Sequence, residues 1–315
     1  MATQPQYDII TFGDMCVDLL VTGADVTPQF GQVEKLVADY TLEMGGSACI
    51  FACQAAKLGL RVGILGRVGA DDFGRLIVRR LAESAVDTSR VIVDATLKTG
   101  LGIALCQDDD RAILTYAGTL AALRPEDVTD EFLASARHLH HASYFLQAGL
   151  RPAMADIFQR AKTLGLTTSL DTNWDPDETW DVDAPNLLPY VDVLMPNEQE
   201  ARYLSAQDTV TSAVAAFQAQ GIPLVTVKSG ADGASVYTAS EVVTRRVAPA
   251  EPGGDSVGAG DSFDAGFLAG WLRGLPLAAC LDIACTCGRA VAAKIGGLAG
   301  QLTQKEIFLN GLSGF

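Results

Sequence analysis

The sequence lacks the two glycine-rich motifs that most often bind nucleotides. It contains no Gly-Lys dipeptide, so the phosphate-binding loop G-x-x-x-x-G-K-[ST] is absent. The pair Gly258 and Gly260 is followed by Phe263, where a dinucleotide-binding fingerprint needs a third glycine. These absences argue against a P-loop NTPase and against a nicotinamide-dependent dehydrogenase domain.

Basic residues and long apolar runs are also scarce. Lys and Arg number 23 against 38 Asp and Glu, which gives a formal net charge of -15. Nucleic-acid binding requires basic side chains that neutralise phosphates, so we expect no nucleic-acid partner. No uninterrupted run of ~18 apolar residues occurs, and the N-terminus has no basic region followed by an apolar stretch. We therefore expect neither a membrane partner nor a signal peptide.

No Cys-x-x-Cys pair is present, so the usual zinc and thioredoxin spacings are missing. Seven cysteines occur nonetheless, mostly in apolar or small-residue runs where a thiol packs as a small hydrophobe. Free thiols in this number are typical of a reducing compartment. The sequence thus predicts a cytoplasmic protein.

Short aliphatic runs alternate with segments of helical period. This alternation predicts an α/β fold, with a mostly parallel sheet covered by helices on both faces. In such sheets ligands bind outside the carboxyl ends of the strands. The expected strands are Ile9–Gly13, Val62–Gly66, His138–Ser143, Thr167–Asp171, Val191–Met195 and Leu224–Val227. The expected helices are Ser47–Leu58, Phe73–Ser84, Arg151–Leu164, Asn197–Leu204 and Val210–Gln220.

Two stretches, residues 15–41 and 99–117, break this alternation with extended, half-polar sequence. In the second, Leu101–Cys106 and Arg111–Tyr116 flank an acidic tip, residues 108–110, which is typical of a β-hairpin. We expect these stretches to form an antiparallel lid over a pocket, although an ordinary surface hairpin fits the pattern too. No linker separates independent domains, so we expect one domain over residues 1–315.

The segment from Asp255 to Phe267 carries the clearest chemistry. Gly258, Ala259 and Gly260 form a small turn that leads into an expected helix, Asp261–Leu272. The unpaired N–H groups and positive dipole end of a helix start can bind phosphate, and small residues let it approach. Asp261 at this position could act as a base toward a hydroxyl during phosphoryl transfer. The alternative is that Asp261 only caps the helix.

Asp255-Ser256-Val257-Gly258-Ala259-Gly260-Asp261-Ser262-Phe263 resembles the C-terminal signature D-[ST]-x-G-A-G-D-x-F of the ribokinase-like (PfkB-type) carbohydrate kinases. Six further segments resemble this family's landmarks in the same order along the chain. They are Gly13 with Asp18, Gly45–Gly59, Gly66–Gly74, Asp171–Asn173 with Trp180, Asn197–Glu200 and Val227–Gly233.

The resemblance implies a three-layer α/β/α core with a mostly parallel sheet and a small antiparallel β lid. It also implies an enzyme that transfers the γ-phosphoryl group of ATP, with Mg²⁺, to a hydroxyl of a sugar or sugar-like molecule. Asp261 would be the base and Gly258, Ala259 and Gly260 the anion hole. The remaining implied roles are the acceptor site (Asp18, Gly45, Gly46, Ile50, Asn173), the ATP site (Lys228, Gly230, Gly233, Thr286), Mg²⁺ through water (Asn197, Glu200) and a monovalent cation such as K⁺ (Asp255, Val257 carbonyl). Relatives often form homodimers through the lid.

Three positions depart from the family pattern. Ile50 replaces an Asn that binds sugar hydroxyls, so we expect Ile50 to contact a carbon of the acceptor. Asp175 replaces an Arg, so we expect it to repel a carboxylate substrate. Thr286 replaces an Asn at the adenine wall. A nucleoside kinase of the same fold is therefore an alternative, and a non-catalytic ligand sensor is a more distant one.

Overall fold

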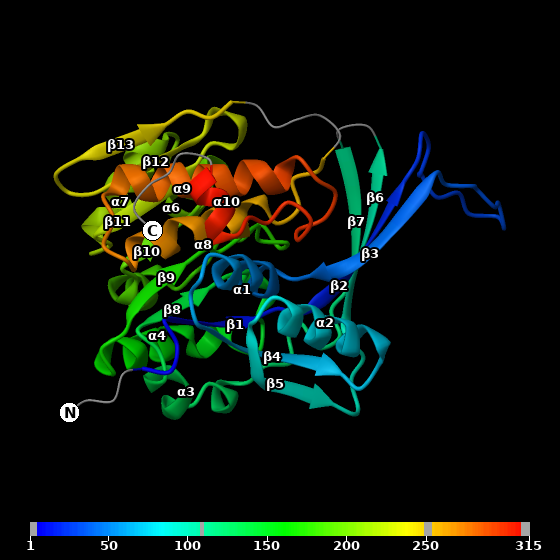
Figure 1. Cartoon of the computed structure of the whole chain (residues 1–315), viewed down its shortest axis with the longest axis horizontal. Coiled ribbons are helices and arrows are strands. Elements are labelled where there is room, and N and C mark those ends of the chain that lie inside the picture. Colours follow the sequence, from blue (N-terminus) through cyan, green and yellow to red (C-terminus); the bar gives the residue numbers. More distant parts are fainter. Residues whose placement is uncertain (1–4, 108–109, 249–253, 310–315) are drawn as a thin grey trace.

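A computed structural model describes residues 5–107, 110–248 and 254–309 of the chain. Its centre is a nine-stranded sheet in the order β13-β12-β11-β10-β9-β8-β1-β4-β5 (Figure 1). Pairing is parallel from β5 to β11 and antiparallel from β11 through β13. The strands are β1 Ile9–Gly13, β4 Val62–Gly69, β5 Asp87–Asp94, β8 His138–His141, β9 Thr167–Leu170, β10 Val193–Leu194, β11 Leu224–Lys228, β12 Ala234–Tyr237 and β13 Val242–Arg245.

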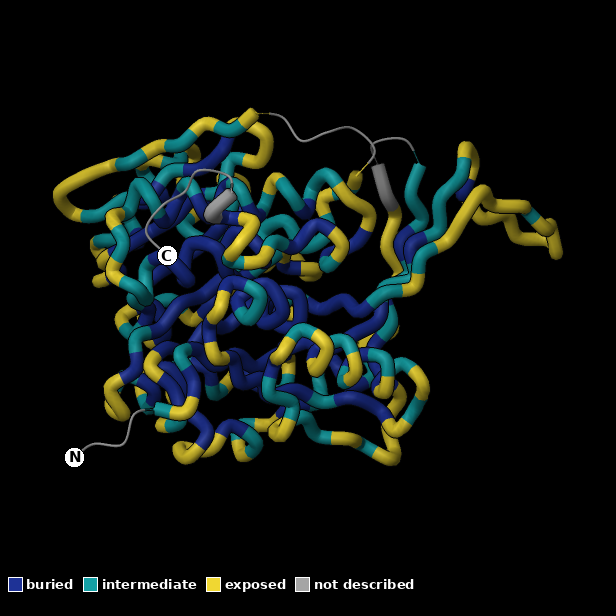
Figure 2. The backbone as a smooth tube through the Cα atoms, in the orientation of Figure 1, coloured by how far each residue is buried: buried dark blue, intermediate teal, exposed yellow. Residues whose placement is uncertain are grey.

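The central strands are apolar because both faces of the sheet are covered. In β1, Ile9 belongs to one apolar core, whereas Ile10 and Phe12 belong to the other. Successive strand residues point to opposite faces, so a run of aliphatic residues supplies both cores. Figure 2 shows these strands as the buried centre of the molecule.

Ten α-helices in the described part of the chain form the two outer layers. One core contains residues of α1 Ser47–Lys57, α2 Asp72–Glu83, α8 Ala259–Trp271, α9 Leu277–Ala292 and α10 Gln304–Leu309. The other contains residues of α3 Asp130–Ala134, α4 Met154–Thr163, α5 Ala184–Leu187, α6 Glu198–Ser205 and α7 Val210–Ala219. The predicted three-layer α/β/α core is confirmed, and none of these helices is long and apolar enough to cross a membrane.

A second sheet of four strands, β3-β2-β6-β7, stands beside the main body (Figure 1). Its hairpins are antiparallel, and they join through parallel pairing of β2 with β6. The residues between β2 and β3 extend away from the body, and Figure 2 shows them as largely exposed. The acidic tip residues Asp108 and Asp109 lie outside the described residues. The strands are β2 Cys16–Thr22, β3 Asp39–Gly45, β6 Gly100–Gln107 and β7 Asp110–Tyr116.

Candidate active site

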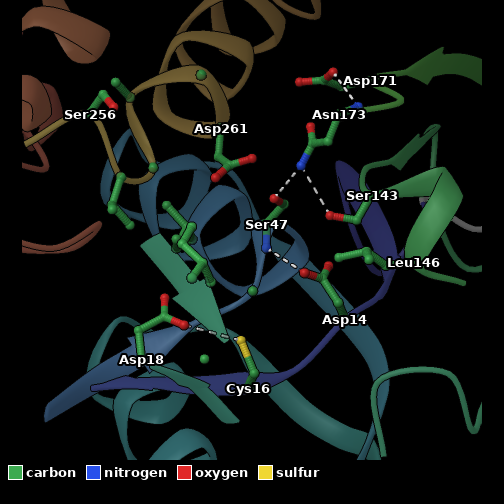
Figure 3. A pocket seen from close by; sticks show the side chains of 18 of the residues that line it. Asp14, Cys16, Asp18, Ser47, Ser143, Leu146, Asp171, Asn173, Ser256 and Asp261 are labelled. Atoms are coloured by element: carbon green, nitrogen blue, oxygen red, sulfur yellow. Dashed lines mark hydrogen bonds between the residues drawn. The ribbon is translucent and has the colours of Figure 1, made fainter. Parts of the chain in front are cut away.

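Two neighbouring cavities lie where the lid meets the carboxyl ends of the central strands. The larger has a volume of about 600 Å³, and its walls come from the lid, the starts of α1 and α8, and the segments that follow β1, β8, β9 and β10 (Figure 3). The smaller, of about 270 Å³, lies between α8, α9 and the loop after β11. The two share the lining residues Lys228, Gly230, Ser256, Ala259 and Gly260.

The start of α8 forms the junction between the cavities. Gly258 caps this helix with φ of +71°, a left-handed conformation that glycine adopts without strain. A Cβ at Gly258 would lie 2.8 Å from Gly297 Cα and 2.9 Å from Ile50 Cγ2, so space also requires glycine. The hydrogen bond from Ser262 N to Gly258 O begins the helix, and the amides of Ala259, Gly260 and Asp261 precede it. These amides lie at the positive end of the helix dipole.

Asp261 lies in the first turn of α8, and its carboxylate points into the larger cavity (Figure 3). Its side chain is buried, with 7% exposed. Burial, together with the negative charges of Asp171 and Asp14, raises the pKa of Asp261 to about 7, although Lys228 and the Ser47 hydroxyl act in the opposite direction. A carboxylate with a pKa near neutrality is suited to accept a proton from a hydroxyl.

Lys228 ends β11 and points inward. Its Nζ lies 2.5 Å from Asp171 Oδ2 and 3.4 Å from both carboxylate oxygens of Asp264. Burial by itself would lower the pKa of Lys228, but the nearby carboxylates, Asp171 above all, raise it. Lys228 was expected to line the ATP site, and no role was expected for Asp264. The ammonium lines both cavities, but its closest partners are these buried acids.

Asp14, which the sequence analysis missed, follows β1 and caps α1. Its carboxylate accepts hydrogen bonds from Ser47 N at 2.9 Å and Ala48 N at 3.2 Å. Gly46 precedes α1 with φ of +88°, and a Cβ there would lie 2.5 Å from Asp14 O. The available signal was position: a polar residue directly after a predicted strand, at the edge where ligands bind.

Asp18 projects from β2 of the lid into the same cavity, beside Cys16, whose Sγ donates to Asp18 Oδ1 at 3.6 Å (Figure 3). Its carboxylate occupies the space left by two glycines. A Cβ on Gly45 would collide with it, and a Cβ on Gly102 would lie 2.6 Å from Asp18 Oδ1. Gly45 therefore serves the site by making room for Asp18.

Asn173 adopts a left-handed conformation with φ of +54°, which turns its amide into the larger cavity. The amide lies 2.6 Å from Ser47 Oγ and 3.0 Å from Ser143 Oγ (Figure 3). All its hydrogen bonds are satisfied when Nδ2 donates to Asp171 and the carbonyl oxygen accepts from both hydroxyls. This network joins β8, β9 and α1 around the pocket.

The expectation for Asp175 was wrong. This carboxylate is fully buried and does not line the cavity. It accepts hydrogen bonds from the backbone N–H groups of Asp177, Thr179 and Trp180, and from the Thr179 hydroxyl. Asp175 closes its own loop and does not face a substrate.

Asn197 and Glu200 form a capping box at the start of α6. Asn197 Oδ1 accepts from the N–H groups of Gln199 and Glu200, and Glu200 Oε2 accepts from Asn197 N. Burial and the charge of Asp171 raise the pKa of Glu200 to about 7. No cluster of three or more His, Cys, Asp or Glu that could enclose a metal occurs in the described residues. A cation at this edge would therefore be held largely through phosphate and water, as is usual for Mg²⁺.

Thr286 does not line the smaller cavity, contrary to expectation. Its hydroxyl donates to Asp282 O in the preceding turn of α9. The α9 residues that form the wall are Cys285, Gly288, Arg289 and Ala292. Gly230 and Gly233 also line this cavity.

Asp255 lies beside the start of α8, and its carboxylate holds two loops together. One oxygen accepts from Val257 N at 2.9 Å and the other from Gly296 N at 3.1 Å. Ile50 lies beneath this turn and lines the larger cavity, 97% buried. An apolar side chain therefore faces the pocket at the position where the family pattern has an amide.

A buried carboxylate beside a glycine-rich helix start, at the junction of two cavities under a lid, is the arrangement expected of a phosphotransferase with an alcohol group as acceptor. Residues 6–304 match the model of the pfkB family carbohydrate kinases. The chain therefore belongs to this family.

Individual relatives differ in their acceptors. An ATP-dependent ribose-1-phosphate kinase from Halopiger xanaduensis is 32% identical over 259 residues, which cover 80% of this chain and 81% of that protein. A 5-dehydro-2-deoxygluconokinase from Geobacillus thermodenitrificans is 28% identical over 291 residues, 87% and 84% of the two chains.

The fold agrees with solved structures. A candidate Ribokinase II from E. coli superimposes with a TM-score of 0.86 at 27% identity, covering 96% of this chain and 98% of that one. A second structure under the same description, in complex with ATP and Mg²⁺, has a TM-score of 0.83 at 26% identity over the same shares of the two chains.

Proposed function

We propose that this protein transfers the γ-phosphoryl group of ATP to a hydroxyl of a sugar or sugar-like molecule, with Asp261 as the catalytic base. The observation that carries the proposal is the position of Asp261, buried beside the α8 amides where the two cavities meet. A non-catalytic sensor would have no use for a buried acid with a pKa near 7 at this point.

We assign the following roles to residues of this chain. Asp18 and Asn173 hold and orient the acceptor, and Asp261 accepts its proton. The amides of Gly258, Ala259, Gly260 and Asp261 stabilise negative charge on the migrating phosphoryl group. The lid excludes water from the larger cavity.

ATP and Mg²⁺ fit the remaining features. The adenosine part would occupy the smaller cavity, between Gly230, Gly233 and α9. Asn197 and Glu200 would hold Mg²⁺ through water; in the complete site the ion would neutralise charge on the phosphates. Glu200 supports this assignment because a nearby cation would offset the burial that raises its pKa to about 7.

A monovalent cation such as K⁺ is proposed at Asp255 and the Val257 carbonyl, because this turn supports the start of α8. Activity in K⁺, compared with Na⁺ at equal ionic strength, tests that assignment. Equal rates in both salts would contradict it.

We propose that residues 1–315 work as one kinase domain and pair into homodimers through the lid. The β2–β3 extension supports pairing, since Phe30 and Leu36 are 102% and 92% exposed. Sedimentation of the wild type and of a Phe30→Ser, Leu36→Ser variant tests the dimer; a wild-type monomer would refute it.

The seven free cysteines favour the reducing cytoplasm as the compartment.

The test of the activity is ADP formation from ATP and Mg²⁺ with pentoses, hexoses, inositols, sugar acids and nucleosides. We expect at least one acceptor to raise the rate well above that of ATP alone. Asp261→Asn should abolish this rise, and ATP binding should persist. The proposal fails if no acceptor raises the rate, or if the variant keeps near-wild-type turnover.

A further inference from the structure

Asp171 lies between two side chains that belong to different substrates in the proposed site. It follows β9, lines the larger cavity and is only 2% exposed. Asn173, two residues later, is assigned to the acceptor, and Lys228, at the end of β11, is expected in the ATP site. Asp171 itself has no role in the mechanism described so far.

The first partner of Asp171 is Asn173. Asp171 Oδ1 accepts a hydrogen bond from Asn173 N at 3.1 Å (Figure 3). When the Asn173 carbonyl oxygen accepts from the hydroxyls of Ser47 and Ser143, its Nδ2 also donates to Asp171, 3.2 Å from each carboxylate oxygen. These bonds hold Asn173 at φ of +54°, a conformation that most non-glycine residues avoid. The orientation of the Asn173 amide in the pocket therefore depends on Asp171.

The second partner of Asp171 is Lys228. Lys228 Nζ lies 2.5 Å from Asp171 Oδ2, and 13% of the Lys228 side chain is exposed. A Cβ on Gly260 would lie 3.6 Å from the same Nζ, so the ammonium borders the space in front of the Gly260 backbone. Because Gly260 belongs to the proposed anion hole, Asp171 holds a cation where it can reach the phosphates.

This double contact requires a carboxylate. Aspartate offers an acceptor at each oxygen, whereas asparagine of the same shape offers one acceptor and one donor. An Asn at position 171 would turn its NH₂ group toward one of two partners that are themselves N–H donors. Asp264 is a second acid beside Lys228, with both oxygens 3.4 Å from Nζ. Among the described residues, no hydrogen bond joins Asp264 to Asn173.

On the basis of the proposed function, we infer that Asp171 is a positioning residue for both substrates. One carboxylate holds Asn173 toward the acceptor and Lys228 toward the phosphates of ATP. Asp171 acts through these two side chains and not on the reacting atoms. Because they share one partner, an acceptor that fixes Asn173 also restricts Lys228. Binding of the acceptor therefore favours binding of the nucleotide.

The first test compares Asp171→Asn with Asp264→Asn, two substitutions of the same size in buried acids that both contact Lys228. Rates are measured with ATP, Mg²⁺ and the acceptor of the panel that has the highest kcat/KM. Asp171→Asn should raise KM for the acceptor and KM for ATP about tenfold each, the usual worth of a hydrogen bond to a charged group. Asp264→Asn should leave KM for the acceptor within about twofold, because Asp264 has no bond to Asn173.

The pattern of KM values distinguishes positioning from a merely structural role. Loss of folded protein would lower kcat and leave both KM values unchanged. The inference fails if Asp171→Asn raises only one of the two KM values, or if both variants raise KM for the acceptor equally.

The wild-type protein provides a second test that does not depend on the folding of a variant. Calorimetry measures the Kd of AMP-PNP with Mg²⁺, with and without the same acceptor at saturation. We expect the acceptor to tighten AMP-PNP binding at least about threefold, and this effect should disappear in Asp171→Asn. An unchanged Kd in the wild type would overturn the inference.

Failure of the kinase function gives a different result. If no acceptor raises ADP formation, the kinase function is refuted, and AMP-PNP binding alone then tests Asp171. Asp171→Asn should weaken that binding about tenfold, and equal affinity would refute the inference as well. Unchanged KM values in an active Asp171→Asn variant refute only the inference.

Discussion

Replacing Asp261 by Asn should make the protein more stable and far less active. Burial and the neighbouring acids raise the pKa of Asp261 from 3.8 to about 7, so the folded state holds a proton that the unfolded chain releases above pH ~4. Stability therefore falls as the pH rises from about 4 to 7, and the loss is complete above the folded pKa. At ~1.36 kcal/mol per pKa unit, the full cost is at most about 4 kcal/mol.

The neutral amide of Asn removes this cost. In urea unfolding, the advantage of Asp261→Asn over wild type should grow by about 2–3 kcal/mol between pH 5 and pH 8. Neighbouring acids such as Asp14 and Glu200 titrate in both proteins, so their contributions largely cancel in the comparison. Asp208→Asn, at an exposed position, is the control and should change neither stability nor rate.

Turnover of the same variant should fall by ~10²-fold or more, the usual contribution of a general base. Wild-type kcat/KM should decline as the pH drops through about 7, because protonated Asp261 cannot accept the hydroxyl proton. Two results would refute the reasoning. One is a parallel pH dependence of stability in wild type and variant; the other is a variant with near-wild-type turnover.

Other substitutions test separate parts of the site. Lys228→Met leaves buried carboxylates without a counter-ion and should cost about 3–5 kcal/mol of unfolding free energy in urea; an unchanged midpoint would contradict this. Gly45→Ala should push the Asp18 carboxylate aside and raise KM for the acceptor ~10-fold at constant KM for ATP. Gly288→Ala places a Cβ 3.1 Å from Ala259 O at the start of α8, so it should narrow the smaller cavity there and raise KM for ATP ~10-fold, whereas Thr286→Val should leave it within about twofold. Equal effects of the two substitutions on KM for ATP would refute the assignment of Gly288, and not Thr286, to the wall of the ATP cavity.

Local pattern was sufficient wherever a residue's role follows from its own segment. The aliphatic run of β1 predicted its bounds at Ile9–Gly13, and the small residues before Asp261 predicted the start of α8 within two residues. Strand period, helix period and the conformational freedom of glycine act over a few residues, so they can be read directly from sequence. The same holds for the helix expected from Asn197, since α6 begins at Glu198.

Contacts between distant segments decided the rest. Lys228 points toward Asp264, 36 residues away in the sequence, because the fold brings the end of β11 beside α8. Asp14 accepts a hydrogen bond from the start of α1, and Asp175 accepts hydrogen bonds from within its own loop. The helical period shows which residues of α9 share a face, but it does not show which face meets the cavity. Packing against α8 decides that Gly288, and not Thr286, faces the cavity. The sequence by itself therefore determined the parallel strands β1, β4, β8, β9, β10 and β11 and the glycine-rich turn before Asp261. Only the tertiary structure decided which side chains meet there, because that depends on how separate elements rotate and pack against one another.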